Sequence, residues 1–153
     1  MFRTAVLAAT SLASAVNGLY FHVEPLTAFD FRIPSESHRV DFTISAPDNV
    51  YEQGGSASAN CSIIWAHDVP TCWQRCTGSS YFARITSKSY NFAGKFSVDV
   101  WQSYVYELGN HNNATIAVTE RQNSFGCSRG GQSDICTFWS EDGVNVTESV
   151  YYG

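Results

Sequence analysis

The stretch FDFRIPSESHRVDFTI, residues 29–44, decides the fold class. Apolar side chains occupy every second position in both of its halves, at Phe29, Phe31 and Ile33 and again at Val40, Phe42 and Ile44. Residues 34–37, Pro-Ser-Glu-Ser, lie between the halves and have the composition of a turn. An apolar period of two on both sides of a turn is typical of a β-hairpin.

The same pattern continues along the chain. Short runs rich in β-branched and aromatic residues alternate with clusters of Gly, Asn, Ser and Pro, which favours strands joined by turns. The predicted strands after the hairpin are residues 62–65, 81–85, 96–101, 104–108, 115–119 and 135–139. Residues 53–59 are predicted as a loop, and residues 144–153 as a last edge strand or a frayed tail. Eight or nine strands without a helix predict an all-β domain, either an antiparallel sandwich or a small barrel.

The first 18 residues, MFRTAVLAATSLASAVNG, have the composition of a secretory signal peptide. Arg3 supplies the positive charge, residues 5–12 the apolar stretch, and Ala13 and Ala15 the small residues of a cleavage site, with the cut after Ala15 or Gly18. A membrane anchor is the alternative, but the stretch is too polar for a span of about 20 apolar residues. We therefore expect a secreted single domain over residues 19–153, with no membrane span.

The composition agrees with one extracellular domain. The chain has 153 residues, 44% of them hydrophobic, 15% charged, and a net charge of −5 that becomes −6 when Arg3 is removed. This is too apolar for a disordered chain and leaves no basic surface for nucleic acid or anionic lipid. A neutral or basic protein partner is the one that electrostatics favours.

Five cysteines lie at positions 61, 72, 76, 127 and 136. An odd number in a secreted chain leaves one of them unpaired or bonded to another molecule. Fifteen arrangements with two bridges are open. Spacing favours Cys127–Cys136 across a hairpin, and Cys61–Cys76 would close a loop worth about 3 kcal/mol in the chain-entropy model. That choice leaves Cys72 without a partner.

The cysteines and their neighbours carry a resemblance. Cys61-Ser62, Trp73-Gln74-Arg75-Cys76 and the run from Cys127-Ser128-Arg129-Gly130-Gly131 to Cys136, with the strands of the opening hairpin, resemble the Alternaria major allergen (Alt a 1-like) family of small secreted fungal β-barrel proteins. The resemblance covers about residues 26–139 and implies the bridges Cys61–Cys76 and Cys127–Cys136. The early cysteine that links two subunits in the founding allergen has no counterpart here. Cys72 is therefore the candidate for an intermolecular bridge and a homodimer.

The resemblance also implies a function. Members of the family resemble extracellular virulence or elicitor proteins that engage plant defence proteins, and some are suspected of carrying small phenolic ligands. No catalytic constellation and no cofactor come with them. We therefore expect a secreted, non-enzymatic fungal effector that acts in the extracellular space on a host protein.

Enzymatic and metal sites are weaker alternatives. A serine hydrolase of the α/β type needs a Gly-x-Ser-x-Gly elbow before a helix, and the sequence has neither. Asp99 and Glu107 are a carboxylate pair that could face one another on adjacent strands, as a glycosidase requires. His67, Cys72 and Cys76 could in principle ligate zinc, but a disulfide is the better use of Cys76 in an oxidising compartment. No metal is expected.

Aromatic residues favour a further alternative, a phenolic-binding or carbohydrate-binding barrel. The chain has four tryptophans and eight tyrosines, most of which we expect in the core. The candidates for exposed, ligand-stacking rings are Trp101, Tyr104, Tyr106 and Trp139. Trp101 has the opposite parity to its apolar neighbours Val98 and Val100 and should therefore face outward.

Three sequons for N-glycosylation occur, at Asn60, Asn113 and Asn145. Residues 109–112 have turn composition, and Asn113 is predicted in that turn, which makes it the leading candidate. Asn60 adjoins Cys61, whose predicted bridge should make it a poor acceptor.

Overall fold

A computed structural model describes residues 20–47, 57–103, 111–138, 143–147 and 149–151. These residues form eleven strands and no helix: β1 (Tyr20–Phe31), β2 (Ser37–Ser45), β3 (Ala59–Trp65), β4 (Gln74–Arg75), β5 (Tyr81–Ile85), β6 (Lys95–Ser103), β7 (His111–Thr119), β8 (Phe125–Arg129), β9 (Ser133–Phe138), β10 (Val144–Thr147) and β11 (Ser149–Tyr151). The predicted signal peptide, residues 1–18, lies outside the described residues.

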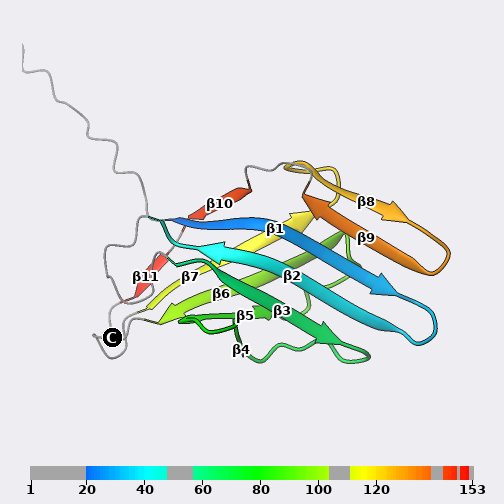
Figure 1. Cartoon of the computed structure of the whole chain (residues 1–153), viewed down its shortest axis with the longest axis horizontal. Helices are drawn as coiled ribbons and strands as arrows, with labels where there is room; N and C mark the ends of the chain where they lie inside the picture. The colour runs from blue at the N-terminus through cyan, green and yellow to red at the C-terminus, as the bar shows by residue number, and fades with distance from the viewer. Residues whose placement is uncertain (1–19, 48–56, 104–110, 139–142, 148, 152–153) are drawn as a thin grey trace, which may run out of the picture.

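The strands form two antiparallel sheets that pack face to face (Figure 1). Sheet A has the order β3-β2-β1-β9-β8, and β10 pairs with the first residues of β1 beside β9. Sheet B has the order β11-β7-β6-β5-β4. The two sheets remain separate, so the fold is the sandwich of the two architectures that the sequence predicts.

The predicted hairpin is confirmed as β1 and β2, with Phe31 opposite Ser37 at the turn. The predicted strand 81–85 coincides with β5, and β3, β6, β7 and β9 contain most of the other predicted strands. The tail forms β10 and β11, so the edge-strand alternative is correct for its described residues. Ala59, predicted in a loop, begins β3, and the predicted strand 104–108 lies outside the described residues.

The core fills the space between the two sheets because alternate side chains of each strand point inward. In β3 every second residue is buried from Ala59 to Trp65, and β5 and β6 alternate in the same way. Phe21 of sheet A meets Tyr81 of sheet B edge to face, with ring centroids 6.0 Å apart. Contacts of this kind join the sheets.

Two disulfides reinforce the sandwich, and both agree with the predicted pairing. Cys61–Cys76 joins β3 of sheet A to the residue that follows β4 of sheet B. Cys127–Cys136 links directly paired positions of β8 and β9. Two such bridges are consistent with an extracellular protein. Cys72 is exposed and unbridged.

A buried polar row closes one end of the core. Trp65, His38, Asp30 and Asp134 are cross-strand neighbours on β3, β2, β1 and β9. Asp30 is 9% exposed and accepts hydrogen bonds from His38 Nδ1 at 2.7 Å, from the backbone N–H of Ala93 at 2.7 Å, and from the Tyr90 hydroxyl. The carboxylate thereby fastens the segment between β5 and β6 to sheet A.

Burial, together with the hydrogen bond to Asp30, raises the pKa of Tyr90 well above its ordinary value of about 10. The unfolded chain releases this proton at about pH 10 whereas the folded chain keeps it, so the free energy of unfolding should fall as the pH rises through that region. Tyr90→Phe should show a smaller fall. Urea unfolding at about pH 8 and about pH 11 measures the difference, and an equal fall in both proteins would contradict this role.

Candidate functional site

An aromatic cluster lies on the outer face of sheet B. Phe82 and Arg84 on β5, and Trp101 on β6, occupy the positions between buried residues and therefore point away from the core. Trp73, just before β4, is 38% exposed. We call these four residues, Trp73, Phe82, Arg84 and Trp101, the sheet B patch.

Short contacts hold the sheet B patch together. The ring centroid of Trp101 lies 4.8 Å from that of Phe82 and 6.1 Å from that of Trp73. The Arg84 guanidinium lies over the Trp73 ring, 4.4 Å from its centroid, and its Nε donates to Asp99 at 3.0 Å. A guanidinium at this distance from an indole face is a cation–π contact.

Asp99, the cross-strand neighbour of Arg84 on β6, orients the guanidinium. Its Oδ2 accepts from Arg84, and its Oδ1 accepts from the hydroxyls of Thr86 at 2.8 Å and Thr115 at 2.9 Å. The carboxylate is therefore occupied on both oxygens and offsets the charge of Arg84. The patch consequently presents pre-positioned rings and a paired cation, a combination that is enriched in the energetic centres of protein interfaces.

The structure places one of the four predicted stacking residues in this patch. Trp101 faces outward, as its parity predicts. Tyr104, Tyr106 and Trp139 lie outside the described residues. Phe82 and Arg84 were not predicted as site residues, although both have the outward parity of their strand, and no pattern in the sequence indicates where the Trp73 side chain lies.

The three sequon asparagines lie on strands. Asn113 belongs to β7 and pairs with Trp101 across the sheet, so its predicted location in a turn is wrong. The turn composition of residues 109–112 extends into β7, because the pairing with β6 already begins at His111. Asn60 and Asn145 are exposed on β3 and β10. An N-glycan on Asn113 would cover the sheet B patch.

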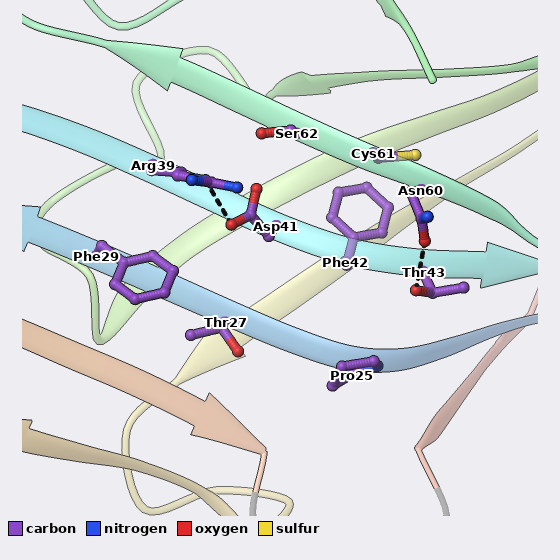
Figure 2. Close-up of a pocket in the computed structure, with 10 residues that line it drawn as sticks. All are labelled: Pro25, Thr27, Phe29, Arg39, Asp41, Phe42, Thr43, Asn60, Cys61 and Ser62. Carbon is purple, nitrogen blue, oxygen red and sulfur yellow. Dashed lines mark hydrogen bonds and ion pairs between the residues drawn. The ribbon is translucent and has the colours of Figure 1, made fainter. Parts of the chain in front are cut away.

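A groove of about 360 Å³ lies on the outer face of sheet A (Figure 2). Outward residues of β1, β2 and β3 form most of its wall, and the complete lining is Pro25, Thr27, Phe29, Arg39, Asp41, Phe42, Thr43, Asn60, Cys61 and Ser62. We call this pocket the sheet A groove. Apart from the buried Phe42 and Cys61, its lining side chains combine one aromatic ring, one ion pair and several uncharged polar groups. No pattern in the sequence predicts this groove.

The described residues do not form the carboxylate pair or the zinc site that the sequence offers as alternatives. Asp99 is engaged by Arg84 and two threonines, and its predicted partner Glu107 lies outside the described residues. Cys76 is bridged to Cys61, which removes it from the zinc set with His67 and Cys72. In the part of the chain that the structure describes, no three His, Cys, Asp or Glu residues gather as metal ligands.

The same described residues contain no helix long and apolar enough to span a membrane. No family model, no curated protein and no solved structure matches the chain.

Proposed function

We propose that this protein is a secreted, non-catalytic binding protein of the fungal effector type, related to the Alternaria major allergen family, and that it engages a host extracellular protein through the sheet B patch. The observation that carries the proposal is the cluster of Trp73, Phe82 and Trp101 with Arg84 on the outer face of the sheet. The two disulfides and the signal-like residues 1–18 support secretion.

The shape of the sheet B patch favours a protein over a flat ligand. The ring planes of Trp73 and Trp101 are inclined at 51° and those of Phe82 and Trp101 at 37°, so the three rings do not form one flat platform. The uneven surface of tilted rings can pack against the side chains of a partner protein. The net charge of −5, which becomes −6 when the signal peptide with Arg3 is removed, favours a neutral or basic partner.

A phenolic ligand on the same patch is the second candidate, because the packed rings of Phe82 and Trp101 offer an outward apolar surface on which a small aromatic ring can stack. Titration with plant phenolics should then quench tryptophan fluorescence, since Trp73 and Trp101 line the patch. An unchanged fluorescence signal removes this candidate.

The proposed function predicts the outcome of infiltrating plant tissue with the protein. Wild type should provoke an immune or cell-death response, and Trp101→Ala should reduce it strongly because the central ring of the patch is lost. Ile64→Ala is the matched control, since Ile64 is 61% exposed on β3 of the opposite sheet. A response that requires exposed carboxylates or serines, and not Trp101, would indicate catalysis instead.

A further inference from the structure

We propose that the sheet A groove is a second binding site and that its ligand is a neutral pyranose ring of an oligosaccharide. The groove lies on the outer face of sheet A, whereas the sheet B patch lies on the outer face of sheet B. The proposal therefore does not depend on the proposed function. The size, charge and hydrogen-bonding groups of the groove each restrict the ligand.

The size of the groove restricts the ligand to a small molecule or one end of a chain. Its volume of about 360 Å³ is near the lower end of ligand pockets, which span about 300–1,000 Å³. It is open to the surface and crosses three adjacent strands (Figure 2). One or two sugar rings fit this space, and the rest of an oligosaccharide can extend along the sheet.

The charge of the groove favours an uncharged ligand. Arg39 Nε lies 2.5 Å from Asp41 Oδ2, and both side chains lie in the groove (Figure 2). Asp41 raises the pKa of Arg39 through this hydrogen bond, so the guanidinium stays charged. Asp41 would repel a phosphate or carboxylate, and Arg39 would repel a cation. Because the ion pair has no net charge, it is best suited to an uncharged ligand.

The polar groups match a pair of neighbouring hydroxyls. The Asp41 side chain is 28% exposed while its Oδ1 is covered, so Oδ2, which already accepts from Arg39, is the oxygen that a ligand can reach. A carboxylate oxygen has a second lone pair, and Oδ2 can therefore accept a ligand hydroxyl as well. Thr43 donates to Asn60 Oδ1 at 2.9 Å. The two N–H donors of the Asn60 amide therefore point away from Thr43. A sugar diol can donate one hydroxyl to Asp41 and accept from Asn60. The exposed Ser62 hydroxyl lies beside them.

An aromatic ring supplies the apolar wall that a sugar requires. Phe29 lines the groove and is fixed by stacking on Phe31, with centroids 5.7 Å apart and planes inclined by 6°. Pro25 lies at the opposite end of the groove on the same strand (Figure 2). The C–H face of a pyranose can pack on such a ring while its hydroxyls reach the polar groups. Among small ligands, this combination of a ring with a donor and an acceptor selects a cyclic polyol.

The test is an NMR titration of the full chain, expressed into an oxidising compartment that adds no N-glycans, so that no covalent sugar on Asn60 fills the groove. The probes are glucose, galactose, mannose, xylose and N-acetylglucosamine, and their β-linked tetramers, up to about 10 mM. At least one probe should shift the backbone amides of β1, β2 and β3. Tryptophan fluorescence should stay unchanged, because no tryptophan lines the groove.

Single substitutions test whether the sugar binds in the sheet A groove. Asp41→Asn keeps the shape but removes the charged acceptor and should weaken binding about tenfold or more, and Phe29→Leu should weaken it by removing the flat ring. Lys95→Ala, at an exposed position of β6 on the opposite sheet, should leave the affinity unchanged. Thermal melts establish that each variant is folded, and Ser62→Ala replaces any variant that is not. The proposal is overturned if no probe binds, if Asp41→Asn and Phe29→Leu bind as wild type does, or if Lys95→Ala abolishes binding.

Discussion

Replacing Asp30 with alanine should lower the free energy of unfolding by about 3–5 kcal/mol, the range for breaking a buried, hydrogen-bonded ionic contact. The carboxylate accepts from His38 and Tyr90, which are partly buried, and from the buried backbone N–H of Ala93. Its removal leaves these donors without their acceptor and releases the segment between β5 and β6 from sheet A. Asp30→Asn keeps the volume and one acceptor oxygen and should cost less.

Urea unfolding followed by circular dichroism measures this effect. Asp68→Ala is the matched control, since Asp68 is exposed in the segment after β3, and it should change stability by less than about 0.5 kcal/mol. A loss below about 1 kcal/mol for Asp30→Ala would show that the polar row does not fasten the two sheets.

Reducing the two disulfides should have the second large effect. In the chain-entropy model the bridge with a sequence separation of 15 contributes about 3 kcal/mol, and the bridge with a separation of 9 about 2.5 kcal/mol. Their sum is a large part of the roughly 5–15 kcal/mol that stabilises an ordinary domain. The Tm should therefore fall by on the order of 15–20 °C.

Thermal melts with and without reductant test this expectation, and Cys72→Ser provides the control because Cys72 belongs to neither bridge. That variant should melt as wild type does before reduction and show the same fall after it. A Tm that reductant does not change would mean that the bridges do not stabilise the fold.

The alternation in residues 29–44 was enough to predict the hairpin but not which side of β1 faces the core. Apolar parity alone would bury Phe29 and Phe31, whereas the structure buries Asp30 and leaves both rings partly exposed. The cause is a register irregularity between Val23 and Leu26, which changes the inward parity from odd to even positions. Asp30 is tolerated inside because donors from another part of the chain satisfy it.

The candidate sites depend on contacts between strands, which a single sequence reveals poorly. Parity predicted that Trp101 faces outward, but its neighbours Phe82 and Trp73 are set by the pairing of β6 with β5 and by the segment before β4. The sheet A groove likewise requires the register of β1, β2 and β3. Cysteine spacing was enough to predict the Cys127–Cys136 bridge, because β8 and β9 form one short hairpin.

Binding to a host protein tests the central claim most directly. The full chain with Cys72→Ser, expressed without N-glycans, is immobilised and exposed to host extracellular fluid, and a retained protein is then isolated for affinity measurement. We predict one specific partner whose affinity falls about thirtyfold or more with Trp101→Ala or Arg84→Ala, as expected for an interface hot spot, and stays unchanged with Ile64→Ala. Equal affinity of the Trp101 variant and wild type, or no specific partner at all, would contradict the account.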